Sequence, residues 1–212
     1  MNKSVIIAMY NDIVSRDALR PVLQGIRFEE NRCIATDCKL LVVYKETNPK
    51  LAGKTMNIRG EEIPGQFPNV DRVFPSEESL ATYQFRIDPA HLYRVTGWFI
   101  RLADANTNDA VVIDGKAFVI RDLHKLLRVY SYANEFPETV FYKTEEGRPL
   151  VIRSKSLHSL LMPCAMPDLS VVDEARRDGE SIKISYENLL NRFAFESWAV
   201  KPVAQPYAWL DE

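Results

Sequence analysis

The sequence lacks the features that mark membrane, secreted and disordered proteins. Its longest uninterrupted apolar run covers residues 5–10, too short for a signal-peptide core or a membrane span. Its three cysteines are an odd number without a CxxC pair, which argues against a disulfide framework and a zinc site. Hydrophobic residues make up 46% of the 212 residues and charged residues 26%, ordinary globular usage. We therefore expect a globular, cytoplasmic protein without a metal or cofactor.

Catalytic motifs are also absent. None of the patterns GxSxG, HExxH and GxGxxG occurs, and neither does a phosphate-binding P-loop. The three histidines, His91, His124 and His158, stand in separate predicted elements without a carboxylate at a telling spacing. We expect no enzyme and assign no catalytic residue. A catalytic cluster that only folding assembles stays open as an alternative.

An excess of positive charge is lacking as well. The chain carries 27 basic and 29 acidic residues, a net charge of −2, so its bulk charge gives no sign of nucleic-acid binding. Most of the negative charge falls in residues 169–212, which hold 5 basic and 8 acidic residues. Bulk charge leaves open how the charges are distributed over the faces of the folded protein.

Hydrophobic periodicity and turn residues predict a mixture of strands and helices. Before residue 76 we expect a helix over 5–19, a strand within 20–29, strands at 33–36 and 40–44, a loop-rich stretch, and an extended linker over 65–75. After it we expect a strand at 83–87, a helix over 88–105 that Asp88 caps, strands at 110–113 and 117–120, a helix over 121–132, a hairpin of strands 139–143 and 150–154, and a strand at 157–162. A last strand at 181–184 and a helix capped by Ser185 follow.

Both central helices are amphipathic and carry basic residues away from their apolar stripes. The helix over 121–132 has four apolar residues on one face, and Arg121, His124, Lys125 and Arg128 lie roughly opposite. Such a basic face is usually just solvated. It also suits contact with a nucleic-acid backbone, because phosphate contacts need cationic side chains on one face and no base-specific code.

Three separated stretches resemble one family, the bacterial DNA polymerase III beta subunit, or sliding clamp. Residues 20–29, RPVLQGIRFE, followed by ATD at 35–37 and Leu41, are similar to a run in its middle domain. Residues 67–75, FPNVDRVFP, are similar to its linker between the middle and last domains, and residues 160–163, LLMP, to its C-terminal segment. The resemblance covers about residues 15–168 and keeps the family's order.

The resemblance implies an α+β, DNA-clamp-like fold of two units, each an antiparallel sheet with helices on the inner face. The units would be residues 1–75, like the middle domain, and 76–168, like the last domain, followed by an acidic extension over 169–212. In the family these stretches form a pocket for short hydrophobic peptides. Carried over, it would be lined by Thr36, Cys38, Lys39, Leu41, Pro68, Arg72, Val73, Leu160, Met162, Pro163 and Cys164. The competing interpretation is plain interdomain packing.

The chain departs from the family in three places. Cys38, Lys39 and Leu40 replace the family's Gly-His-Arg, which changes the polarity of the pocket rim. A whole first domain is missing, and the unit over 1–75 lacks its own second helix and hairpin. We expect residues 181–197 to fold back and complete that unit.

The function implied is a DNA-binding processivity or scaffold protein that tethers DNA polymerase or repair proteins. Double-stranded DNA would be held without sequence preference by Arg94, Arg101, Arg121, Lys125 and Arg128. The DNA would lie inside a homo-oligomeric ring. We expect no association with a membrane. The first alternative is a monomeric peptide-binding or decoy module that does not encircle DNA. A variation places residues 205–210, QPYAWL, in the pocket of their own chain.

Overall fold

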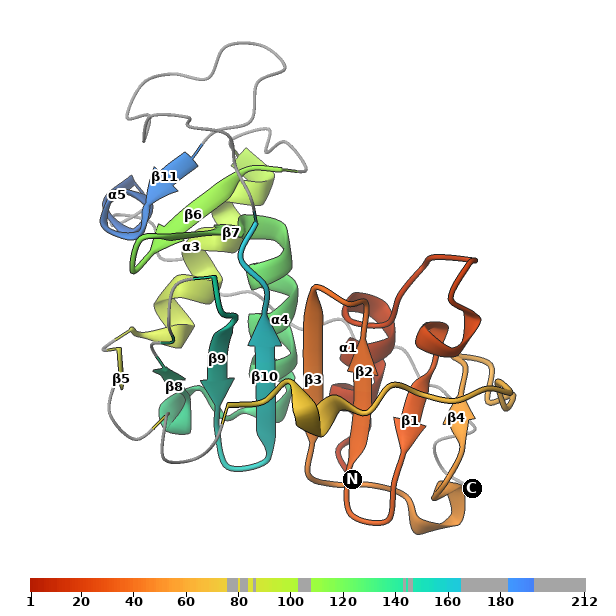
Figure 1. The fold of residues 1–212 in the computed structure, drawn as a ribbon. Helices are drawn as coiled ribbons and strands as arrows, with labels where there is room; N and C mark the ends of the chain where they lie inside the picture. The colour runs from red at the N-terminus through yellow and green to blue at the C-terminus, as the bar shows by residue number, and fades with distance from the viewer. Residues whose placement is uncertain are drawn as a thin grey trace.

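Two antiparallel units share one continuous sheet. The computed structural model describes residues 1–75, 80, 84–85, 87–102, 108–142, 144, 147–164 and 183–192. Within these residues the chain forms an eight-stranded and a three-stranded sheet. Helices α1 (Lys3–Asp12) and α4 (Ile120–Ala133) pack against each other on one face of the larger sheet (Figure 1). The fold is therefore α+β, with antiparallel strands and helices on one face of the larger sheet, as the resemblance implied.

The larger sheet has the strand order β4-β1-β2-β3-β10-β9-β8-β5, with every neighbouring pair antiparallel. The residues before the linker contribute β1 (Ile26–Phe28), β2 (Cys33–Thr36), β3 (Leu40–Tyr44) and β4 (Thr55–Met56). The later residues contribute β5 (Gln84–Phe85), β8 (Val140–Tyr142), β9 (Leu150–Arg153) and β10 (Leu157–Leu161).

The two halves of this sheet join where β3 pairs with β10, a junction that we call the seam. The register runs from Leu40 opposite Leu161 to Tyr44 opposite Leu157. All five residues of β3 are buried, because the helices cover one face of the sheet and the linker crosses the other. Both strands are rich in apolar residues, which suits strands at the centre of a sheet that is covered on both faces.

Side-chain caps fix the starts of α1 and α3. The Asn2 side chain accepts a hydrogen bond from the Ser4 amide at 3.0 Å at the start of α1. At the start of α3 (Pro89–Leu102), the Asp88 carboxylate accepts bonds from the amides of Ala90 at 2.9 Å and His91 at 3.0 Å, which confirms the predicted cap. α4 ends at Ala133, and the capping residue Asn134 has a φ of 58°, the left-handed conformation common at helix ends.

The segment between α1 and β1 differs from the prediction. α1 ends at Asp12 rather than near residue 19, and the Ser15 amide then donates to the Leu23 carbonyl at 2.8 Å. The predicted strand over 20–29 is a 3-10 turn, η1 (Pro21–Gln24), followed by the short β1. Gly25 separates the two, and a Cβ there would lie 2.6 Å from the Met56 carbonyl oxygen. This close approach of β4 requires glycine and shortens the strand.

The smaller sheet corrects the expectation for the C-terminal segment. It contains β6 (Ala110–Ile113), β7 (Lys116–Val119) and β11 (Lys183–Ser185), and β11 pairs in parallel with β6. Helix α5 (Tyr186–Arg192) follows and packs on α3. The idea that residues 181–197 complete the first unit is therefore wrong for 183–192, because Ile184 and Leu189 are buried in the second unit. Residues 181–182 and 193–197 lie outside the described part, as do 165–180 and 205–210.

Apolar residues lie on both faces of the larger sheet. The main core fills the space between the sheet and helices α1, α3 and α4. On the opposite face, an outer apolar cluster contains Ile34, Leu41, Val43, Val70, Leu80, Val151 and Leu160, with Phe67, Phe74 and Tyr142 against it. Short 3-10 turns connect the elements: η2 (Pro49–Leu51), η3 (Val70–Arg72) and η4 (Phe136–Glu138). Of the helices in the described residues, none has the length and apolarity to span a membrane.

An ion pair between Asp12 of α1 and Arg128 of α4 bridges the two units. The Arg128 Nε donates to the Asp12 carboxylate at 2.7 Å, and Nη2 makes a second bond. The Asp12 side chain is 5% exposed and that of Arg128 39%. The carboxylate is thus the more deeply buried partner, and it depends on the guanidinium for its compensating charge.

We predict that the two partners of this pair are unequally sensitive to removal. Arg128→Ala leaves a buried carboxylate unpaired and should lower the free energy of unfolding by about 3 kcal/mol. Asp12→Ala leaves a guanidinium that reaches water and should cost about 1–2 kcal/mol. Urea unfolding followed by circular dichroism measures both, with the exposed Arg94→Ala as a control expected within about 0.5 kcal/mol of the parent. Equal losses for the two variants would contradict this account.

Candidate functional site

The seam brings together two of the stretches that the sequence singled out. Leu41 of β3 lies opposite Leu160 of β10, and the Met162 amide donates to the Lys39 carbonyl at 2.9 Å. The start of β3 and the end of β10 are thus held side by side, although about 120 residues separate them in the chain. Thr36, opposite Leu41 on β2, belongs to the same row of the sheet.

The linker, residues 65–75, lies across the seam on the face opposite α1 and α4 (Figure 1). Val70 is 6% exposed and packs in the outer apolar cluster, with Phe67 and Phe74 beside it. The Asn69 side chain caps η3 by accepting a bond from the Asp71 amide at 3.1 Å. These contacts place Pro68 and Val73 next to the strands that form the seam.

An apolar hollow of about 540 Å³ opens beside the linker. It is lined by Leu19, Arg20, Pro21, Val22, Leu23, Cys38, Pro64, Gly65 and Pro68. Two of the eleven residues predicted for the pocket, Cys38 and Pro68, belong to this lining. Residues 19–23 form a wall of the hollow that was not among the predicted pocket residues, although residues 20–29 belong to a stretch that carries the family resemblance.

The other predicted pocket residues differ in their accessibility. Val73 is 55% and Met162 43% exposed, and Lys39 and Arg72 are exposed as well. Thr36, Leu41 and Leu160 are buried and support the surface from beneath. Pro163 and Cys164 are half-buried, and the Cys164 amide donates to the Ala117 carbonyl at 2.9 Å. Of these nine predicted residues, Lys39, Arg72, Val73 and Met162 are therefore accessible, and none of the nine lines the hollow.

Arg20 and Cys38 provide the polar groups of the hollow. The Arg20 guanidinium donates to the Cys38 sulfur at 2.9 Å and lies 3.9 Å from the Asp17 carboxylate. Cys38 has a φ of 77°, the left-handed conformation that favours glycine. Its amide donates to the Thr36 hydroxyl at 3.0 Å, which stabilises this tight turn between β2 and β3. An apolar hollow with one cation at its wall suits an apolar chain segment better than a small polar metabolite.

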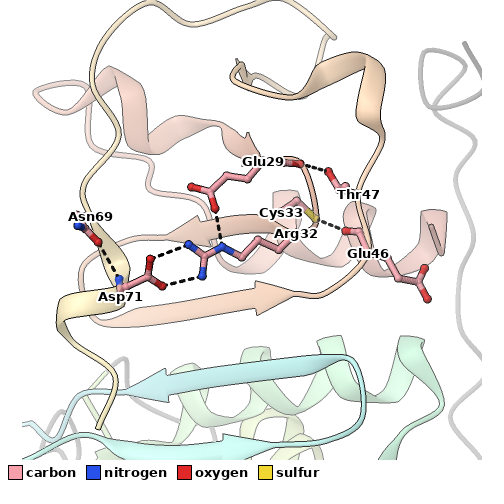
Figure 2. Close-up of polar contacts among 7 residues, drawn as sticks. All are labelled: Glu29, Arg32, Cys33, Glu46, Thr47, Asn69 and Asp71. Atoms are coloured by element: carbon pink, nitrogen blue, oxygen red, sulfur yellow. Dashed lines mark hydrogen bonds and ion pairs between the residues drawn. The ribbon is translucent and has the colours of Figure 1, made fainter. Parts of the chain in front are cut away.

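A cluster of charges fastens the linker to the first unit, and Figure 2 shows it. The Arg32 guanidinium donates to both carboxylate oxygens of Asp71, at 2.7 and 2.9 Å, and to Glu29 at 2.5 Å. We call these three residues the linker clasp. The bonds from Arg32 hold the pKa of the Asp71 carboxyl below its usual value. The Thr47 hydroxyl donates to the Glu29 carbonyl at 2.9 Å and ties this turn to the chain after β3.

The residues predicted to face DNA fall into two groups. Arg94 and Arg101 on α3 are exposed. On α4, the Lys125 ammonium donates to the Asp122 carboxylate at 2.9 Å, and Arg128 is paired with Asp12. Arg121 is half-buried. Arg94 and Arg101 of α3 are thus exposed at the surface. The charged groups of Lys125 and Arg128 form ion pairs within the protein.

His124, on the same side of α4, is enclosed by α3. Its ring stacks on Tyr93 with centroids 4.7 Å apart, and its Nδ1 lies 3.0 Å from the Thr96 hydroxyl. Burial, together with the positive charges of Arg128 and Arg101, lowers the pKa of His124 to about 4. A Cβ at Gly97 would meet this ring at 3.0 Å, so the glycine allows the close approach of the two helices. This side of α4 is therefore partly a packing surface.

Metal-binding clusters are absent from the described residues, which contain no group of three or more His, Cys, Asp or Glu residues able to hold an ion. Cys33, Cys38 and Cys164 are free thiols. Burial raises the pKa of the Cys33 thiol.

The fold is similar to that of bacterial sliding clamps. Among solved structures, the chain is similar to the DNA polymerase III subunit beta sliding clamp of Bartonella birtlesii bound to griselimycin, with 13% identity and a TM-score of 0.58 over 77% of this chain and 63% of that one. The beta sliding clamp of C. crescentus gives 14% identity and a TM-score of 0.57, covering 78% and 64%. The Helicobacter pylori beta clamp bound to a DNA ligase peptide gives 13% and 0.53, covering 77% and 63%.

These similarities to solved structures, at 13–14% identity, show the fold of the chain. The chain spans less than two thirds of the length of these three clamps. A scan against protein-family models finds no match, and a search of curated proteins finds none either. The resemblance noted in the sequence is thus confirmed at the level of the fold.

We predict that His124 makes the stability of the protein depend on pH. Its pKa is lower in the folded state, about 4, than its ordinary value of 6.5, so the unfolded chain takes up a proton first as the pH falls. The stability is fully present above pH 6.5 and should decrease by up to about 3 kcal/mol towards pH 4. Urea unfolding at several pH values measures this loss.

His124→Asn should flatten the slope in this window, whereas His91→Asn should keep it. Identical slopes for the parent and His124→Asn would show that the buried ring is not the titrating group.

Proposed function

We propose that this protein is a sliding-clamp-like scaffold that holds partner proteins near DNA and has no catalytic activity of its own. The observation that carries the proposal is the apolar hollow beside the linker, lined by residues 19–23, Cys38, Pro64, Gly65 and Pro68. All of these residues belong to the first unit and its linker. In the family that the sequence resembles, the corresponding stretches form the pocket for partner peptides.

The exposed apolar side chains support a peptide as the ligand. Leu19 in the wall of the hollow is 90% exposed, and Val73 and Met162 are exposed on the adjoining segments. A short segment with hydrophobic anchors would remove these side chains from water, which is the main driving force for docking into an apolar groove. The Helicobacter pylori clamp, similar in fold, binds a DNA ligase peptide. We infer that replication or repair proteins bind here in the same manner.

Association with double-stranded DNA would use the helical side of the larger sheet. Arg94 and Arg101 lie one above the other on exposed turns of α3, seven residues apart. Contacts of this kind track phosphates without reading sequence. With a net charge of −2, the protein would hold DNA mainly by encircling it. A ring needs more than one copy, and β4 and β5 are the edge strands of the described sheet that could pair between copies.

The alternative is a monomeric module that binds peptides, or acts as a decoy, without encircling DNA. The internal pairing on α4 favours it, because Arg128 is held by Asp12 and Lys125 by Asp122. Fewer cations then remain for phosphates. Three free thiols suit the reducing conditions of the cytoplasm under either proposal.

We predict that the hollow binds a clamp-directed peptide. The probe is the DNA ligase peptide seen on the Helicobacter pylori clamp, labelled with fluorescein and followed by anisotropy, with griselimycin as competitor. Leu19→Asp should weaken binding about tenfold, because it places a charge on the apolar wall without disturbing the core. Ile58→Asp, at another exposed apolar residue outside the lining, should stay within about twofold of the parent. Failure of the parent to bind either probe, or equal losses in the two variants, would refute the pocket.

We predict retention on closed DNA. The protein should stay on nicked circular plasmid in gel filtration, run free after linearisation, and show an oligomeric mass by light scattering. Charge reversal of Arg94 and Arg101 to Glu should reduce the retained fraction more than the same change at Arg27 and Arg59 of the first unit, because only the α3 residues belong to the proposed DNA-facing set. A monomer that binds the peptide and ignores both DNA forms would establish the alternative module.

A further inference from the structure

The linker clasp is the strongest polar connection between the linker and the first unit. Arg32 stands immediately before β2, and its guanidinium has three bonds to carboxylates, two of them to Asp71 in a parallel, bidentate arrangement (Figure 2). Bidentate pairs fix orientation as well as distance. The side chain of Arg32 is 24% exposed and that of Asp71 61%. The clasp therefore lies at the edge of the covered face and holds the linker from outside.

What the clasp holds is one rim of the apolar hollow. Asp71 belongs to η3, whose cap residue Asn69 follows directly after Pro68, a lining residue of the hollow. On the other side of the turn, the Val73 amide donates to the Val70 carbonyl at 3.2 Å. These two hydrogen bonds are made within the turn and hold it together. A restraint on Asp71 is therefore transmitted to Pro68.

The remaining anchors of the linker do not replace this restraint. Phe67, Val70 and Phe74 contact the outer apolar cluster, and apolar contacts permit sliding and rotation because they have no preferred direction. The clasp also lies in the wall of a second hollow of about 360 Å³, together with Phe74, Pro75 and His158. The two hollows leave open space on both sides of the turn. In the described part of the chain, the clasp is the directional bond that joins η3 to the first unit.

We propose that Arg32 is a positioning residue for the peptide site: by binding Asp71 it keeps the Pro68 rim of the apolar hollow in the open, ligand-ready position. This inference rests on the proposed peptide-binding function. Arg32 itself does not line the hollow, so its effect on a peptide passes through the linker. A preformed rim spares the ligand the cost of ordering it, which raises affinity without a new contact.

The test measures peptide affinity and linker dynamics in the full chain. Arg32→Gln and Asp71→Asn should each weaken the labelled DNA ligase peptide about three- to tenfold, and the double variant should be no weaker than either single one, since both remove one interaction. Arg32→Lys, which keeps the charge but loses the fork, should fall between the parent and Arg32→Gln. Amide hydrogen exchange should accelerate at Asp71 and Val73 in Arg32→Gln, with the sheet unchanged.

Arg27→Gln is the matched control, because Arg27 lies on the neighbouring β1 and donates to the Gly53 carbonyl rather than to the linker. It should leave both the affinity and the exchange at Asp71 and Val73 as in the parent. Parent-like binding by Arg32→Gln, or an equal loss in Arg27→Gln, would overturn the positioning role. Those results would not contradict the proposed peptide site, provided that Leu19→Asp still weakens peptide binding. If the parent itself does not bind the peptide, the proposed function fails and the positioning role with it.

Discussion

The pairing of β3 with β10 is the interaction on which the rest of the structure depends. It joins Leu40–Tyr44 to Leu157–Leu161 over five residue pairs and turns two short sheets into one. Both apolar layers extend across it, since residues of both units belong to the main core and to the outer apolar cluster. Without the seam, each half-sheet would expose an edge strand and lose part of its cover on both faces.

A sheet that is apolar on both faces must be covered on both. Helices α1, α3 and α4 cover one face, as in other layered α+β folds. On the opposite face, the described cover consists of linker residues Phe67, Val70 and Phe74 together with Leu80, a thinner layer than the helices provide. The apolar hollow and the exposed Val73 are consequences of this thin cover. The candidate site is therefore a region where the first unit and the linker leave apolar side chains uncovered, and an incoming peptide would extend the linker layer.

Local signals predicted much of the fold, and tertiary contacts account for the differences. The strands at 33–36 and 40–44 and the helix start at Asp88 were predictable, because β-branched runs and an Asp-Pro cap act over a few residues. The early end of α1 and the short β1 depend on partners far along the chain, the Leu23 carbonyl and Met56. For the candidate site, the family resemblance pointed to eleven residues, of which Cys38 and Pro68 line the hollow. It missed the wall over 19–23, because a hollow is defined by which segments approach one another in space.

The charged face of α4 shows a limit of helical periodicity. Spacing alone places Arg128 and His124 opposite the apolar stripe and predicts a solvated or DNA-facing side. In the folded protein that side meets α1 and α3, where a buried Asp12 carboxylate binds Arg128 and the ring of Tyr93 covers His124. A charge pattern fixes which residues share a face but leaves open whether that face meets water, another helix or a ligand. Because the cations of α4 are partly used to join the units, electrostatic attraction to DNA would fall mainly on α3.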